Sequence, residues 1–115
     1  MEEIVSPISW ADFEKIDIRV GTILEAKAFE KAKKPAYQLR IDFGKLGIKN
    51  SSAQITTLYS IEKLPGQQVI AVVNFPPKQV ANYVSECLVL GIYDEDKNVI
   101  LLQPERNTAN GLKIG

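Results

Sequence analysis

One glycine near the N-terminus constrains the fold more than any other residue. Residues 16–20, Ile-Asp-Ile-Arg-Val, alternate apolar and polar side chains in the way of a half-buried strand. Gly21 follows, and the apolar positions then shift to Thr22, Leu24 and Ala26. A glycine at such a change of phase indicates a β-bulge or a sharp bend. Small barrels need this bend, because one long strand has to serve both halves of the barrel.

The segments that follow have the lengths and patterns of an all-β protein. Alternation is clearest over residues 37–43, and a weakly apolar strand is expected over residues 48–55. A helical turn is expected over residues 59–64, and the strand at 69–75 is apolar on both faces, as a central strand is. A helix between the third and fourth strands is typical of the OB fold, a five-stranded Greek-key barrel.

The two ends of the chain predict extensions to this barrel. Residues 9–12 have a hydroxyl N-cap and a carboxylate three residues later, so a short helix is expected to start there. Residues 88–102 predict a hairpin around an acidic turn. The tail 104–115 has few apolar residues beyond Leu112 and Ile114, and it either frays or packs on another surface. We therefore predict an OB barrel with short helices and with N- and C-terminal extensions used for dimerisation.

Charge and length limit the class of partner. With 115 residues the chain is expected to form one domain over residues 1–115. Its 14 basic residues balance 14 acidic ones, which argues against a protein that coats nucleic acid indiscriminately. A local patch remains open, because residues 27–49 contain seven basic residues and two acidic ones.

Several residue types that chemistry requires are missing. Cys87 is the single cysteine and there is no histidine, so an internal disulfide, a structural zinc site and histidine-dependent triads are excluded. We expect no enzyme activity, no cofactor and no metal. The N-terminus has no signal-peptide pattern, and no apolar run is long enough to cross a bilayer. A cytoplasmic protein without membrane insertion is the expectation.

Three motifs in order along the chain carry a family resemblance. They are Asp-Ile-Arg-Val-Gly at 17–21, Ile-Lys-Asn-Ser-Ser-Ala-Gln-Ile at 48–55 and Ala-Val-Val-Asn-Phe-Pro-Pro-Lys-Gln-Val at 71–80. Together they resemble the tRNA-binding domains of the methionyl-tRNA-synthetase C-terminal type, from about Phe13 to the C-terminus. The branch most similar to this chain contains small, free-standing dimers described as secretion-related chaperones. The resemblance implies tRNA and a second copy of the chain as partners.

A basic and polar set is predicted to bind folded tRNA. The loop at 31–35 is rich in lysine, which neutralises phosphates, although a merely solvated loop is favoured about two to one on composition alone. Asparagine and serine are poor choices inside the strand at 48–55, and they can bind phosphates or 2′-hydroxyls. A solvated strand edge explains them about equally well. In the family this segment helps to form the RNA surface. The predicted set is Lys31, Lys33, Lys34, Arg40, Lys49, Asn50, Ser51, Ser52 and Gln54.

One departure from the family falls inside this set. The wider family often has a glycine where this chain has Ser52-Ala53. The departure favours the chaperone-named branch.

An apolar set is predicted to bind a second copy of the chain or a peptide. The double proline after the strand at 69–75 is either a simple strand terminator or a stiff contact that costs little entropy on binding. The predicted residues are Trp10, Phe75, Pro76, Pro77, Val80, Leu112 and Ile114. A dimer doubles the lysine patch.

Two alternatives to tRNA binding follow from the same residues. The resemblance also implies a chaperone that binds unfolded or preprotein chains alongside the export machinery, and such a protein needs an exposed apolar patch. The other alternative is a general single-strand binder, which stacks bases on exposed rings. Tyr37 and Phe43 fall on the core face of their strand, so no aromatic platform is expected.

Overall fold

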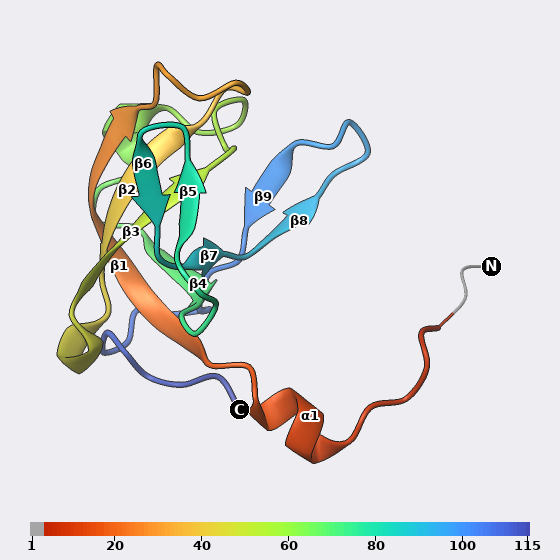
Figure 1. Cartoon of the computed structure of the whole chain (residues 1–115). Coiled ribbons are helices and arrows are strands. Elements are labelled where there is room, and N and C mark those ends of the chain that lie inside the picture. Colours follow the sequence, from red (N-terminus) through yellow and green to blue (C-terminus); the bar gives the residue numbers. More distant parts are fainter. Residues whose placement is uncertain (1–3) are drawn as a thin grey trace.

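The computed structural model describes residues 4–115 and shows an antiparallel sheet curled into a nearly closed barrel (Figure 1). Its five strands lie in the order β3-β2-β1-β4-β7, and two hairpins, β5–β6 and β8–β9, stand outside it. The strands are β1 (Ile18–Ala28), β2 (Tyr37–Asp42), β3 (Ile48–Ala53), β4 (Gln68–Val72), β5 (Lys78–Val80), β6 (Tyr83–Ser85), β7 (Leu88–Val89), β8 (Gly91–Tyr93) and β9 (Val99–Leu101). The helices are α1 (Trp10–Glu14) and the 3-10 turns η1 (Gly44–Leu46) and η2 (Ile61–Lys63). The prediction of an all-β, OB-like barrel is confirmed.

The long strand β1 serves both halves of the barrel, as predicted, but its irregularity lies elsewhere. Residues 18–22 pair with β4 and residues 22–28 pair with β2, and the register shifts between Ile23 and Glu25. Ile23 is completely buried and Leu24 is 44% exposed, so the predicted apolar phase is wrong at Leu24.

Gly21 has a different function from the predicted one, because the bulge is not at this residue. A Cβ atom on Gly21 would lie 2.6 Å from Cγ2 of Ile41 and 2.7 Å from Cε1 of Phe43. The missing side chain lets two core residues pack directly against the backbone of β1.

The barrel interior is filled by the predicted face of β2 and by β4. Leu39, Ile41 and Phe43 are completely buried, which confirms the alternation that the sequence showed. All five residues of β4 are buried, as expected of a central strand. Packing of these side chains makes the barrel a rigid support for the loops at its ends.

The barrel closes between β3 and the segment that follows β6. The backbone N–H of Glu86 donates to Asn50 O (2.8 Å), and a Glu86 carboxylate oxygen accepts from Asn50 N (2.9 Å). The hydroxyl of Ser85 accepts from Ser52 N (3.1 Å). The backbone groups on the outer edge of β3 thus bond largely to side chains instead of to a regular strand ladder. These bonds protect the edge strand.

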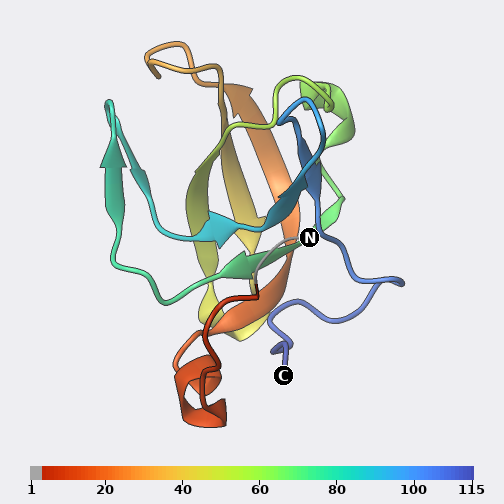
Figure 2. The same ribbon diagram turned by 90° about the vertical axis from the view of Figure 1, so that its right-hand side faces the viewer.

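The ends of the chain fit the sequence predictions in part. The capping box at Ser9 and Asp12 is present, and the predicted hairpin is β8–β9. The tail does not fray: Val20 N donates to Leu112 O and Ile114 N donates to Ile18 O, which places the tail along β1 (Figure 2). The β5–β6 hairpin after the double proline was not predicted.

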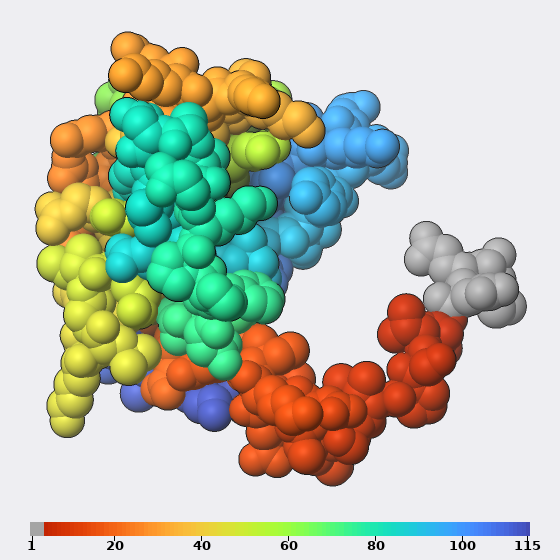
Figure 3. All heavy atoms as spheres, viewed as in Figure 1, coloured from red at the N-terminus to blue at the C-terminus, as the bar shows by residue number. Residues whose placement is uncertain are grey.

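The segment of residues 4–14 stands away from the barrel (Figure 3). Its apolar side chains are open, with Ile4 95%, Val5 85% and Trp10 83% exposed. No helix within residues 4–115 has the length and the apolar content needed to cross a membrane.

Candidate nucleic-acid interface

The lysine-rich loop between β1 and β2 lies at one end of the barrel and has a fixed base. Phe29 N donates to Ala36 O (3.1 Å), and the buried Phe29 ring packs edge-on against Tyr83 at 5.5 Å between ring centres. Three predicted binding residues of this loop are exposed, and none forms an ion pair within residues 4–115: Lys31, Lys33 and Lys34. Their charges are therefore available to a ligand.

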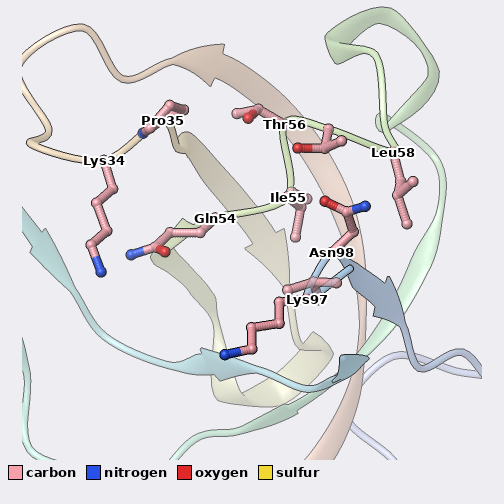
Figure 4. A pocket seen from close by; sticks show the side chains of 10 residues that line it. Lys34, Pro35, Gln54, Ile55, Thr56, Leu58, Lys97 and Asn98 are labelled. Atoms are coloured by element: carbon pink, nitrogen blue, oxygen red, sulfur yellow. The ribbon is translucent and has the colours of Figure 1, made fainter. Parts of the chain in front are cut away.

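A hollow of about 250 Å³ lies beside this loop and is called here the loop-end hollow. Its walls are the loop, the segment after β3 and the turn of the β8–β9 hairpin (Figure 4). Lys34, Gln54 and Lys97 come from these three segments and reach the same hollow. The full lining is Lys34, Pro35, Gln54, Ile55, Thr56, Thr57, Leu58, Lys97, Asn98 and Val99.

The polar side chains of the loop-end hollow are not used by the fold. Within the described part of the chain, six polar side chains of the hollow make no hydrogen bond or ion pair with another protein group: those of Lys34, Gln54, Thr56, Thr57, Lys97 and Asn98. The hollow thus offers two ammonium groups, two amides and two hydroxyls above a partly apolar floor. Such a set can bind an anion together with a group that both donates and accepts hydrogen bonds.

A second hollow of about 240 Å³ lies on the outer face of β1, β2 and β3, beneath the β5–β6 hairpin, and is called the hairpin groove. Here the charges are paired: the Glu25 carboxylate lies 3.0 Å from Lys27 Nζ and 3.5 Å from Arg40 Nη1. The hydrogen bond and charge of Lys27, followed by those of Arg40, hold the pKa of Glu25 below its usual value. Glu25 therefore offsets one of the two positive charges of the groove and lies within ion-pair distance of both.

Tyr83 forms the hairpin side of this groove. Its hydroxyl donates to Leu39 O (3.2 Å) and its ring rests on Phe29. Burial raises the pKa of the Tyr83 hydroxyl, and the charge of Glu86 adds to the effect. The hairpin thus stays against the sheet face and partly covers it.

The structure divides the predicted binding set. Lys34 and Gln54 meet at the loop-end hollow, with Lys31 and Lys33 beside it on the same loop. Arg40 and Asn50 line the hairpin groove, and Ser52 lies on the same outward side of β3.

Two predicted members do not join either group. Ser51 is 1% exposed and its hydroxyl donates to Cys87 O (3.1 Å), so its placement at the binding surface is wrong. Lys49 pairs with Ile41, which places it on the side of β3 opposite to the outward residues. The outward set is smaller than the sequence suggested.

Three residues outside the predicted set line the two hollows: Lys97, Lys27 and Tyr83. Lys97 lies in the acidic turn Asp-Glu-Asp-Lys-Asn, which the sequence predicts only as the turn of a hairpin. Its backbone has a φ of 63°, an uncommon value that turns the lysine toward the hollow. Only the fold brings this turn next to the lysine-rich loop.

The predicted apolar set lies at the opposite end of the barrel except for Val80, which pairs with Tyr83 at the tip of the β5–β6 hairpin, where Tyr83 packs against Phe29 at the loop end. The backbone of Asp17 donates to the Asn74 side chain (2.9 Å), which in turn donates to Lys15 O (2.7 Å). These bonds hold the end of α1 beside the segment with the double proline, and the C-terminus lies nearby (Figure 1). Exposed members are Trp10, Phe75, Pro76, Pro77 and Leu112, and half-buried members are Val80 and Ile114.

A small β-barrel with an unpaired basic loop end is the arrangement of nucleic-acid-binding domains of the OB type. Over residues 18–113 the chain matches the family described as "Putative tRNA binding domain". The chain belongs to this tRNA-binding family.

Solved structures and curated sequences place it within the family. The chaperone CsaA from Bacillus anthracis is 52% identical, with a TM-score of 0.91 over 96% of this chain and 100% of that one. The CsaA chaperone protein from Picrophilus torridus is 54% identical, with a TM-score of 0.89 over 95% of this chain and 100% of that one. The chain is thus a CsaA-like tRNA-binding domain.

A similar domain occurs inside an enzyme. The methionine–tRNA ligase of Methanococcoides burtonii is 37% identical over 107 residues, 93% of this chain. The match spans only 16% of that ligase's length. The shared part is a binding domain.

Proposed function

We propose that this protein is a non-enzymatic, cytoplasmic homodimer that binds folded tRNA through the loop end of its barrel. Lys31, Lys33 and Lys34 bind phosphates, and Gln54 fixes the position of the RNA. Arg40, Asn50 and Ser52 flank this surface along the hairpin groove. Buried Ser51 and inward-side Lys49 are not part of the proposal.

The observation that carries this proposal is the contrast in charge pairing. The loop lysines have no acidic partner within residues 4–115, whereas Arg40 shares Glu25 with Lys27. Counterion release on binding RNA needs cations that the protein has not already neutralised. Other lysines of the described residues are also unpaired, such as Lys45 and Lys63, but the loop end gathers four unpaired lysines on two neighbouring segments.

The homodimer is supported by apolar surface at the other end of the molecule. Trp10, Phe75 and Leu112 are 83%, 53% and 51% exposed. The segments that carry them, which are α1, the stretch after β4 and the C-terminal tail, lie around one end of the barrel (Figure 1). Large exposed side chains that gather in this way mark an interaction site. Dimerisation through this end leaves both loop ends open, and two basic surfaces give the avidity that one small site lacks.

The experiment is binding of labelled tRNA over a salt series, with the mass of the free protein measured by light scattering. The proposal predicts twice the chain mass at micromolar protein and a linear fall of log affinity with log salt. A monomer mass would remove the dimer from the proposal. An affinity that does not change with salt would remove the phosphate contacts.

Chaperone activity is the second candidate, and the exposed apolar side chains of residues 4–8 favour it. Ile4, Val5 and Ile8 are 95%, 85% and 66% exposed, which is costly in water unless a partner covers them. Two solved relatives carry the name chaperone. In this candidate an unfolded or preprotein chain, on its way to the export machinery, binds apolar surface that the dimer leaves open.

Salt separates the two candidates. An unfolded peptide that binds equally well at low and high salt, and that does not displace tRNA, supports a separate apolar site. Peptide binding that disappears at high salt together with RNA binding contradicts the second candidate, because both ligands would then be held by the same charges.

A further inference from the structure

We infer that the loop-end hollow takes a single unpaired nucleotide of the bound RNA, with its phosphate between the ammonium groups of Lys34 and Lys97. The inference rests on the proposed function and adds which part of the RNA enters the protein. A nucleotide combines an anion, a sugar with hydroxyls and a flat base whose edge both donates and accepts hydrogen bonds. The hollow has a partner for each of these groups.

The lining matches this chemistry group by group. The two lysines supply charge for a phosphate, and the hydroxyls of Thr56 and Thr57 can bond a 2′-hydroxyl. The side-chain amides of Gln54 and Asn98 can both donate and accept, as the edge of a base requires.

The floor of the hollow is apolar and suits the face of a base. Ile55 is 3% exposed, and Val99 packs against the core cluster. Pro35 and Leu58 are exposed at the sides. No aromatic ring lines the hollow, so the base is held by apolar contact and hydrogen bonds instead of stacking.

The size of the hollow selects one nucleotide and excludes a helix. Its volume of about 250 Å³ lies just below the range of small-molecule sites, about 300–1,000 Å³. A paired helix presents its phosphates on a convex surface and keeps its bases stacked inside, so it cannot enter. An unstacked nucleotide from a loop or a chain end can.

The walls are held in place before any ligand binds. In the β8–β9 turn, Asp94 N donates to Asn98 O (2.9 Å) and the Asp94 carboxylate accepts from Asn98 N (2.8 Å). The Tyr59 hydroxyl accepts from Leu101 N (2.9 Å), and Tyr59 O accepts from the Tyr37 hydroxyl (2.7 Å). These bonds connect the walls of the hollow, so binding costs little ordering entropy.

The first test uses ¹⁵N-labelled protein titrated with uridine and adenosine 5′-monophosphates, and separately with inorganic phosphate. The inference predicts that the nucleotides shift the amide signals of residues 54–58 and 97–99, and that phosphate alone produces smaller shifts at the same sites. Nucleotides that shift no signal there, in a protein that binds tRNA, overturn the inference and leave the proposed function standing.

The second test compares Lys97→Asn with the matched control Lys45→Asn. Asparagine tolerates the positive φ of Lys97, and Lys45 is an exposed lysine beyond the opposite end of β2. We expect Lys97→Asn to weaken tRNA binding about fivefold, as loss of a charge-assisted contact does. Its effect on a blunt RNA duplex is expected to be less than about twofold, because a duplex leaves the hollow empty.

The outcomes of the second test separate the claims. An equal loss for tRNA and duplex makes Lys97 an ordinary phosphate contact and overturns the inference. If wild-type protein binds no tRNA at all, the proposed function fails, and the nucleotide titration alone decides whether the hollow is a nucleotide site.

Discussion

Two hollows of similar volume, the loop-end hollow and the hairpin groove, use their charges in opposite ways. In the hairpin groove Glu25 pairs with both Lys27 and Arg40, and the ring of Tyr83 covers part of the sheet face. In the loop-end hollow the side chains of Lys34 and Lys97 pair with no acidic group of residues 4–115. The number of basic residues in a region therefore does not measure its capacity to bind RNA.

The difference follows from whether each cation lies in a paired strand or in a loop. Glu25 and Arg40 are cross-strand partners in the β1–β2 ladder, and Lys27 lies two residues from Glu25 on the same face. Opposite charges at such positions attract each other because the ladder holds them in register. Lysines on loops and turns have no fixed neighbour, so they remain available to a ligand.

The largest expected effect comes from removing charge at the loop end. Lys33→Ala combined with Lys34→Ala should weaken tRNA binding about tenfold at moderate salt and make the salt slope shallower by about 1.5 to 2. The reason is the loss of two phosphate contacts. Fluorescence anisotropy over a salt series measures both quantities, with Lys45→Ala as the control. A slope equal to that of wild type would exclude this loop from the site.

Freeing the cations of the hairpin groove should act in the other direction. Glu25→Gln keeps the shape of the side chain but leaves Lys27 and Arg40 without their acidic partner. We expect tRNA to bind about threefold more tightly, with a steeper salt slope. Glu105→Gln is the control, because it frees Arg106 on the C-terminal tail. Equal gains in the two variants would mean that net charge alone is responsible.

A pair of serines tests which side of β3 faces the ligand. Ser51→Ala removes the bond to Cys87 O and should lower the free energy of unfolding by about 1 kcal/mol without changing tRNA affinity. Ser52→Ala, on the outward side, should leave stability nearly unchanged and weaken tRNA binding less than about threefold. Urea unfolding and anisotropy give the two numbers. The reverse pattern would invalidate the assignment of faces.

The smallest effect concerns Cys87, which lies where the barrel closes against β3. Burial raises the pKa of the Cys87 thiol to about 11, so the folded state favours the neutral thiol. This contribution to stability is present below the ordinary thiol pKa of about 8.5 and is lost as the pH rises toward 11. We expect no alkylation of native protein at pH 8, rapid alkylation in urea, and a stability loss above pH 9 that Cys87→Ala lacks. Fast alkylation of Cys87 in the native protein at pH 8 would show that solvent reaches the thiol where the barrel closes.

The sequence predicted the barrel well because periodicity reports burial directly. The alternation from Tyr37 to Phe43 and the uniform burial of β4 both follow from apolar spacing. The bulge was placed at Gly21 because glycine and a phase change coincide there, yet close packing of Ile41 and Phe43 is the reason for that glycine.

The candidate site was harder to predict, because its residues converge only in three dimensions. The loop lysines and Gln54 were identified from composition and from the family resemblance. Ser51 was assigned to the surface because a single serine does not show which way its strand faces. Lys97 was missed because the acidic turn that carries it reaches the lysine-rich loop only through the fold.

The most direct test of the account maps which lysines the RNA covers. Free protein and its tRNA complex are acetylated briefly, and modification at each lysine is compared by mass spectrometry. The account predicts protection of four lysines at the loop end and none of two elsewhere on the barrel: Lys31, Lys33, Lys34 and Lys97 against Lys45 and Lys49. Protection of Lys27 with the loop lysines still reactive would contradict it, because the sheet face of the hairpin groove would then be the RNA surface.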